Sequence, residues 1–255
     1  MFPKRFWMRM ALTVPLAAVI LFSGLQLWNI NRRYRAEAEI HRFMLSFKPA
    51  AVVPEALQTH TEGMPAKVSF EESPVHHAGI AELRELNEDV IGWLTIDGTA
   101  IDYPFTRGDD NDFYLRRDIN KDTAYAGTVF MDYRNQADFS DLNTILYGHN
   151  MKNGSMFHHL TKFGDKEFFN SHTTATIYLE NENIPLEIFA YMILPPIDLA
   201  DIGYGMPLAH HVDYLRAHAQ IWRNIEISAN DRLVTLSTCS YEFNDARTVV
   251  VAKIL

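Results

Sequence analysis

Leu233-Val-Thr-Leu-Ser-Thr-Cys239 is a run of β-branched, aliphatic and small residues that ends in the single cysteine of the chain. A seven-residue segment, Ser240 to Ala246, separates this run from a second apolar run that Arg247 opens. Two such runs joined by a short loop predict a pair of antiparallel strands. Because paired strands lie about 4.8 Å apart, we expect the thiol of Cys239 and the guanidinium of Arg247 to meet at one end of the pair.

Short runs with strand composition recur along the rest of the chain, and turn residues separate them. The eight expected strands are 92–96, 100–105, 127–131, 144–147, 174–179, 186–192, 233–238 and 248–255. Helices are expected over 81–90, 112–116, 155–169 and 207–225. Many short strands with few helices predict a mainly β fold, either an antiparallel sandwich or a closed barrel, with the 207–225 helix inserted between two strands.

The N-terminus has the pattern of a membrane segment. Met10 to Ile30 is 21 residues long without a charge, which is enough to cross a bilayer as a helix, and basic residues flank it on both sides. A cleaved signal peptide is the alternative, because Ala36-Glu37-Ala38 has the small-x-small form of a cleavage site. The apolar run is longer than a usual signal core, so we favour an uncleaved anchor, and the balanced flanking charges leave its orientation open.

Composition divides the chain into three parts. Residues 1–35 form the anchor with its basic flanks, and 36–78 contain a juxtamembrane helix followed by a Pro-rich linker with four prolines between 48 and 77. A globular β domain is expected over 79–255. Residues 36–255 contain 17 basic and 32 acidic residues, so this part of the chain would repel a phosphate backbone. We therefore expect no nucleic acid partner.

A second candidate for chemistry lies at the end of another expected strand. His149 follows Thr144-Ile-Leu-Tyr-Gly148, with a glycine that lets the chain turn. A nearby cation favours a thiolate and stabilises an oxyanion, so Cys239, His149 and Arg247 would provide a nucleophile, a base and a cation at one rim. The alternative is that Cys239 belongs to the core while the other two lie on the surface.

These motifs resemble the active site of sortases, and of class B sortases in particular. Thr235-Leu-Ser-Thr-Cys239 with Arg247, and Leu146-Tyr-Gly-His149, carry the resemblance. It extends to Gly92-Trp-Leu-Thr-Ile96, Ile101-Asp-Tyr-Pro104, Asp110-Asn-Asp-Phe-Tyr-Leu115, Ala126-Gly-Thr-Val-Phe-Met-Asp-Tyr-Arg134 and Val249-Val-Val-Ala-Lys253. It covers about residues 80–255. The helical insertion before the cysteine strand is also a class B feature.

The resemblance implies an eight-stranded barrel that acts as a membrane-anchored, extracytoplasmic cysteine transpeptidase of a Gram-positive-type bacterium. Cys239 would attack a threonine carbonyl in the C-terminal sorting motif of a secreted protein, His149 would transfer protons, and Arg247 would hold the motif and the oxyanion. The acceptor amine would belong to a peptidoglycan precursor or to a pilin lysine. Such a reaction conserves energy in the thioester and needs no cofactor.

The resemblance also implies a substrate groove lined by Asn111, Leu115, Tyr147, Ser237 and Thr238. Structural roles are the alternative, with Asn111 as a helix cap, Leu115 and Tyr147 in the core and Ser237 as an ordinary strand residue. Some relatives have an acid directly after the cysteine, whereas this chain has Ser240 there and Glu242 further on. The sorting motif is expected to be selected by the segment Pro195 to Met206.

Other readings of the sequence remain open. A membrane-anchored cysteine hydrolase would use the same residues with water in place of the amine, and a non-catalytic barrel would only bind a ligand. Paired histidines at 76/77, 158/159 and 210/211 would point in different directions within an element, so we expect no metal site from them. The segment that starts at Asp118 has Thr123 where a calcium loop requires glycine, so that site is not expected.

Overall fold

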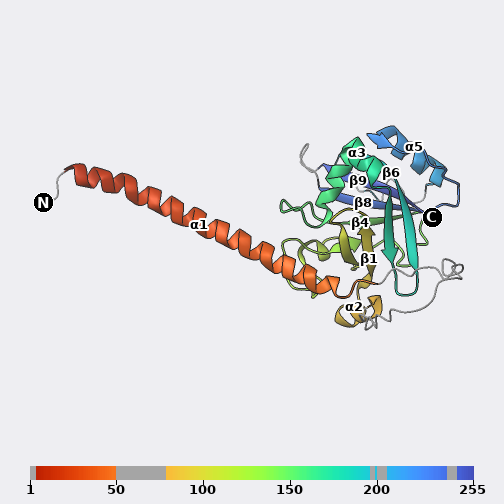
Figure 1. Cartoon of the computed structure of the whole chain (residues 1–255), viewed down its shortest axis with the longest axis horizontal. Helices are drawn as coiled ribbons and strands as arrows, with labels where there is room; N and C mark the ends of the chain where they lie inside the picture. Colours follow the sequence, from red (N-terminus) through yellow and green to blue (C-terminus); the bar gives the residue numbers. More distant parts are fainter. Residues whose placement is uncertain (1–3, 50–78, 196–198, 200–205, 240–245) are drawn as a thin grey trace, which may run out of the picture. The chain divides into compact units, whose positions relative to one another are not determined.

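A long N-terminal helix precedes a β-barrel in the computed structural model of the chain (Figure 1). The structure describes residues 4–49, 79–195, 199, 206–239 and 246–255, and for 4–12 and Cys239 it describes the backbone only. The chain divides into two compact units, 1–42 and 43–255. The predicted linker lies almost wholly outside the described residues, so the domain boundaries at 35 and 78 stay predictions.

Helix α1 (Lys4–Leu45) is 42 residues long and continues through Pro15. Its part from Thr13 is long and apolar enough to cross a membrane, and none of its apolar window is buried within the protein. Proline is tolerated in such spans because its local loss of a hydrogen bond is compensated nearby. The predicted continuation of the helix beyond the apolar run is confirmed up to Leu45.

One nine-stranded sheet forms the second unit, in the order β5-β1-β2-β3-β4-β8-β9-β6-β7. The strands are β1 (Val90–Ile96), β2 (Asp102–Thr106), β3 (Val129–Met131), β4 (Asn143–Tyr147), β5 (Thr174–Tyr178), β6 (Asn183–Leu194), β7 (Ile221–Trp222), β8 (Leu233–Cys239) and β9 (Arg247–Ile254). Because β5 also pairs with β6, eight strands close into a barrel and the short β7 lies outside the ring. The expected closed barrel is therefore confirmed, and closure removes its exposed edges.

Two of the strand pairs in this barrel are parallel, namely β2–β3 and β4–β8. The short runs in the sequence contain no signal for these two parallel pairings. Parallel neighbours need a long connection, and the chain provides one in each case. The segment between β2 and β3 contains the 3-10 helix η2 (Tyr114–Arg116), while everything from η3 to β7 lies between β4 and β8.

The helices differ from the expected ranges at their ends. Helix α2 (Ile80–Leu86) stops at Asn87, whose side chain accepts a hydrogen bond from the backbone N–H of Asp89, and Val90 already belongs to β1. The single helix expected over 155–169 is two elements, the 3-10 helix η3 (Phe157–Gly164) and helix α3 (Lys166–Ser171). Asp165 separates them because its carboxylate caps α3 by accepting from the N–H of Phe168.

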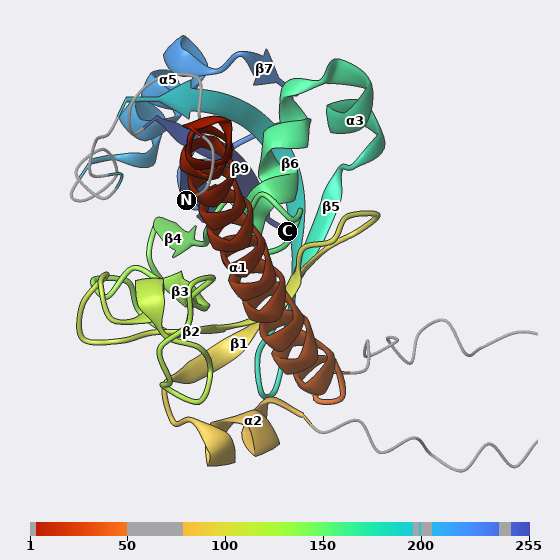
Figure 2. The same cartoon turned by 90° about the vertical axis from the view of Figure 1, so that its left-hand side faces the viewer.

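The inserted helix α5 (Leu208–His218) is shorter than the expected 207–225. Its last predicted turns are extended, and Trp222 pairs with Ala190 of β6 instead of lying on the helix. Figure 2 shows α5 and β7 at one end of the barrel and α2 at the other. Buried Leu208 and Leu215 of α5 belong to one apolar cluster with Met192, Leu194 and Val249 of the barrel. The helix therefore covers the outer face of β6 and β9.

Candidate active site

Cys239 and Arg247 end two neighbouring strands at the same rim of the barrel. They are register partners at the end of the antiparallel β8–β9 ladder, as the hairpin predicted from the sequence requires. On its other side, Arg247 pairs with Leu194, the last residue of β6. Strand β9 thus places Arg247 between the cysteine strand and the strand that leads into the 195–206 segment.

The parallel β4–β8 pair brings His149 to this rim as well. Tyr147 is in register with Ser237, and the N–H of Gly148 donates to the carbonyl oxygen of Ser237 at 3.1 Å. His149 and Cys239 each follow this pair by two residues on strands that run in the same direction. Because neighbouring strands lie about 4.8 Å apart, the two residues leave the sheet side by side. The backbone register supports the expected common rim, which stays a prediction for the side chains.

The ring of half-buried His149 has a defined partner. Its Nε2 lies 2.7 Å from the carbonyl oxygen of Leu115, which is in η2. A carbonyl oxygen only accepts, so Nε2 carries a proton and Nδ1 is the basic nitrogen of the neutral ring. The backbone of His149 is also fixed, since its carbonyl oxygen accepts from the N–H of buried Phe157 at 2.9 Å.

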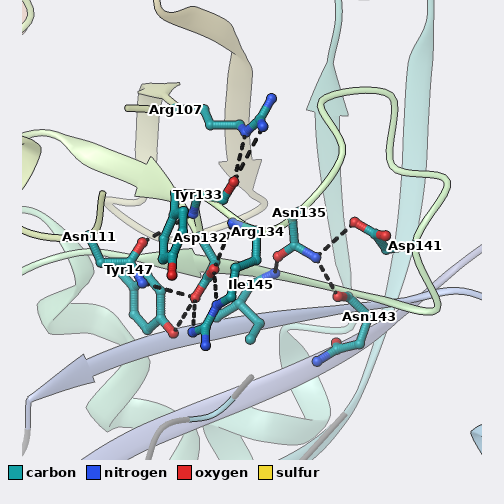
Figure 3. A network of polar contacts seen from close by, with 10 residues as sticks. All are labelled: Arg107, Asn111, Asp132, Tyr133, Arg134, Asn135, Asp141, Asn143, Ile145 and Tyr147. Carbon is teal, nitrogen blue, oxygen red and sulfur yellow. Dashed lines mark hydrogen bonds and ion pairs between the residues drawn. The ribbon is translucent and has the colours of Figure 1, made fainter. Parts of the chain in front are cut away.

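A buried carboxylate organises the neighbouring polar residues (Figure 3). Asp132 is fully buried, and its Oδ2 accepts from Asn111 Nδ2 at 3.0 Å and from the Tyr147 hydroxyl at 3.1 Å. Arg134 donates to both carboxylate oxygens, from Nε at 2.9 Å and from Nη2 at 2.8 Å. Two of the residues predicted for the substrate groove, Asn111 and Tyr147, are therefore held by one acid.

Asn111 has little hydrogen-bonding capacity left for a substrate. Besides the bond from its amide nitrogen to Asp132, its Oδ1 accepts from the backbone N–H of Tyr133 at 3.1 Å. Its amide has two N–H donors, so one of them and the second lone pair of Oδ1 remain. The resemblance implies that Asn111 lines the substrate groove. Asn111 can bind a substrate there only through its one remaining N–H and the second lone pair of its Oδ1.

The strand residues before the cysteine divide between two faces. Side chains alternate along a strand, so Ser237 shares the face of Cys239 while Thr238 lies on the opposite face. Both are buried, and neither hydroxyl has a hydrogen-bond partner among the described residues. Ser237 thus offers an unused hydroxyl on the face of the cysteine, whereas Thr238 pairs across the ladder with Thr248.

Sequence reasoning found the strand ends but missed two features. The backbone carbonyl of Leu115 contacts His149, and a pattern of side chains contains no signal for a main-chain acceptor. Asp132 belongs to the motif Ala126-Gly-Thr-Val-Phe-Met-Asp-Tyr-Arg134, but the sequence pattern alone predicts no role for it. The available signal was an acid directly after a buried strand with an arginine two residues later, because such a pair can share hydrogen bonds.

Several expectations fall outside the described residues. Ser240, Glu242 and most of the segment Pro195 to Met206 are among them. Within the described part, no group of three or more His, Cys, Asp and Glu side chains is arranged to hold a metal ion. The 158/159 histidines bond to protein groups instead, with His158 Nδ1 2.8 Å from Asn150 Oδ1 and His159 Nδ1 accepting from the N–H of Ala100 at 3.0 Å.

Comparisons with known proteins show which family the chain resembles. The Sortase domain family model matches residues 94–255. Sortase B of Listeria monocytogenes is 36% identical over 251 residues, which are 96% of each chain. The structure of Clostridium perfringens sortase B is 34% identical with a TM-score of 0.65, covering 69% of this chain and 98% of that one. A Streptococcus pyogenes class B sortase involved in pilus biogenesis is 30% identical with a TM-score of 0.64, covering 69% and 97%.

Proposed function

The chain belongs to the sortase family as a class B cysteine transpeptidase, and from this premise we propose that Cys239, His149 and Arg247 carry out its acyl transfer. One observation supports the assignment most directly. Cys239 is paired with Arg247 on one side, and on the other side β8 runs parallel to β4, which leads into His149. A nucleophile, a base and a cation thus leave three adjacent strands at one rim.

Cys239 is the nucleophile of the proposed reaction. Its thiolate attacks the carbonyl carbon of a threonine in the sorting motif, a carbon–sulfur bond forms, and the peptide carbon–nitrogen bond breaks. Nδ1 of His149 takes the thiol proton as the thiolate forms and then passes it to the leaving amine. An acceptor amine then attacks the thioester, gives its proton to His149, and the thiolate returns as the new amide forms.

The tautomer of His149 indicates which nitrogen moves the proton. Because Nε2 is bound to the Leu115 carbonyl at 2.7 Å, Nδ1 is the nitrogen that exchanges protons with the leaving and incoming amines. The same bond to the Leu115 carbonyl also restricts rotation of the His149 ring. A fixed ring keeps the proton within reach of the reacting nitrogen, which is the requirement for general acid and base catalysis.

Arg247 is proposed to bind the substrate and the tetrahedral oxyanion. Its guanidinium presents several N–H donors in one plane, which suits an oxyanion and a peptide carbonyl together. Strand β9 is central in the β8–β9–β6 group, so Arg247 emerges between Cys239 and Leu194. A peptide that lies along this rim would pass both the thiol and the guanidinium.

The proposed substrates are secreted proteins with a C-terminal sorting signal. Class B relatives favour motifs of the Asn-Pro-x-Thr type, and Asn111, Leu115, Tyr147 and Ser237 are the candidate groove residues. The acceptor is an amine of a peptidoglycan precursor or of a pilin lysine. The pilus role stated for the Streptococcus pyogenes relative supports the second possibility.

Helix α1 is proposed to anchor the protein as a single span with the barrel outside the cytoplasm. Its length and apolar composition support this placement. An extracytoplasmic barrel would meet both exported proteins and wall precursors. Exposed residues of the anchor would then face lipid rather than water.

The test uses the full chain in detergent micelles with a panel of Asn-Pro-x-Thr peptides, with and without a small amine. We expect an amide product whose yield depends on the amine. A product that is only the free acid at every amine concentration would identify a hydrolase instead. The same measurement with Cys239→Ala provides the background.

A further inference from the structure

The carboxylate of Asp132 is saturated with hydrogen bonds. Its Oδ1 accepts from the backbone N–H of Arg134 at 3.0 Å and from Arg134 Nε, while its Oδ2 accepts from Arg134 Nη2, Asn111 and Tyr147. A carboxylate has about four lone-pair sites, so five donors leave none of them unused. No other group could enter this cluster without displacing one that is already there.

The donors come from three separate segments, as Figure 3 shows for the residues around Asp132. Asn111 precedes η2, Tyr147 ends β4, and Arg134 follows β3. Four residues after Asn111, the carbonyl of Leu115 accepts from His149, which itself lies two residues after Tyr147. The two segments that meet at the histidine ring are therefore joined a second time at Asp132.

We propose that Asp132 is a positioning residue for His149, because it fixes both the segment that carries the ring and the segment that supplies its Leu115 acceptor. These contacts form a closed ring. Hydrogen bonds join Asp132 to Asn111, Leu115 to His149, and Tyr147 to Asp132. The chain itself joins Asn111 to Leu115 and Tyr147 to His149. Opening this closed ring at the carboxylate lets Leu115 and His149 move apart. The inference rests on the proposed role of His149 in proton transfer.

We call Asp132 together with Arg134, Asn111 and Tyr147 the clamp. The negative charge of the Asp132 carboxylate is essential to it. Burial by itself raises the pKa of Asp132, but the hydrogen bonds from Arg134 and Asn111 and the charge of Arg134 bring it below the usual value. The group therefore stays ionised at neutral pH and acts only as an acceptor. A neutral amide in its place would turn one N–H donor toward the donors of Arg134, Asn111 or Tyr147, which separates them.

Asp132→Asn is the test variant, and Asp141→Asn is its matched control. Asp141 accepts from Asn135 Nδ2 at 2.9 Å and from the N–H of Gln136 in the same loop, but Asn111 and Tyr147 bond to Asp132 instead. Both variants replace an acid with its amide in neighbouring parts of one loop. Only the first opens the ring around His149.

The measurements use the full chain in detergent micelles with ¹⁵N-labelled histidine. For Asp132→Asn we expect the His149 ring signals to lose the signature of a fixed Nε2–H tautomer. We also expect kcat/KM to fall roughly 10- to 100-fold because kcat falls, which is the scale of the effect when a catalytic group is misplaced. Alkylation of Cys239 should keep its parental rate. For Asp141→Asn we expect unchanged His149 signals and a kcat/KM within about twofold of the parent.

Unchanged His149 signals in Asp132→Asn would overturn the proposal, whatever happens to activity. If that variant does not fold, Tyr147→Phe opens the ring by removing one hydroxyl, and it must then shift the same signals. The parent protein could also fail to catalyse transpeptidation while Asp132→Asn still changes the His149 signals. That result would refute the proposed function but would support the proposal for Asp132. The two claims therefore fail on different readouts.

Discussion

Cys239 and Arg247 are register partners at the end of the β8–β9 ladder, so the backbone places both residues at the same rim of the barrel. The loop between them joins two strand ends that are already adjacent. Their separation along the sequence therefore says little about their separation in space. If these two residues have the proposed roles, we expect a change at Arg247 to affect the chemistry at Cys239 directly.

Arg247→Lys keeps the charge but removes the planar set of donors. If the guanidinium holds the substrate and the oxyanion through directed hydrogen bonds, lysine cannot replace it. We expect transition-state stabilisation to fall by roughly 2 to 4 kcal/mol, measured from the ratio of kcat/KM in the parent to kcat/KM in the variant. Arg84→Lys, at an exposed pair with Glu180, is the control. Transpeptidation close to the parental rate by the Arg247 variant would show that guanidinium geometry is unimportant.

Gly148→Ala tests how the chain is fixed before His149. A Cβ atom at this position would lie 2.7 Å from the ring of Phe157, which is fully buried, so the ring or the backbone would have to shift. We expect urea unfolding to show a free energy of unfolding about 1 to 3 kcal/mol lower than that of the parent. We also expect activity to fall more than in variants that are destabilised to the same extent elsewhere. Gly108→Ala is the control, because its nearest contact is an ordinary 3.4 Å. Equal effects in both variants would refute close packing as the cause.

The stability effect of Asp132→Asn should depend on pH. The folded-state pKa of Asp132 lies below its ordinary value, so its contribution is present above the unfolded-state pKa of about 3.9 and is lost as pH falls through the folded-state pKa. We expect the variant to lose about 3 kcal/mol at pH 7, and we expect the difference from the parent to shrink as pH falls below about 3.9. The comparison is Asn143→Ala, which removes a neutral buried bond to Thr235. A difference that does not shrink as pH falls below about 3.9 would contradict the ionised clamp.

Residues 43–49 should contribute to the stability of the barrel unit. Met44 is buried, and Lys48 forms an ion pair with Asp102 at 2.9 Å. The partly exposed ion pair adds little, whereas a buried methionine contributes roughly 2 kcal/mol. We expect a chain starting at 79 to fold, and one starting at 43 to be about 2 kcal/mol more stable by urea unfolding followed at Trp93. Equal midpoints and slopes would show that 43–49 contribute nothing.

The residue pattern alone predicts the site only where chemistry and strand ends coincide. Cys239, Arg247 and His149 are found because each ends or begins an apolar run, and a strand end projects its residue toward a rim. The parallel pairing of β4 with β8 is not visible locally, because the two strands lie more than 80 residues apart in the chain. The clamp at Asp132 joins Asn111, Arg134 and Tyr147 from three segments spread over 37 residues, so no short-range pattern contains it.

Helix ends were the least predictable part of the fold. The spacing of Leu83, Leu86 and Val90 fits a helix, yet Asn87 ends it through its side-chain bond to the N–H of Asp89. Likewise Trp222 continues the apolar stripe of α5 but pairs with Ala190 of β6. In both cases a hydrogen bond decided between two conformations that the apolar pattern permits equally.

The most direct test of the account is intact-protein mass spectrometry of the full chain, mixed with Asn-Pro-x-Thr-type peptides before and after an amine is added. We predict an adduct whose mass is that of the peptide fragment ending at threonine, mapped by digestion to Cys239 and discharged by the amine as the new amide appears. Cys239→Ala should form neither the adduct nor the amide. Amide formation by the alanine variant, or an adduct on any other residue, would contradict the central claim.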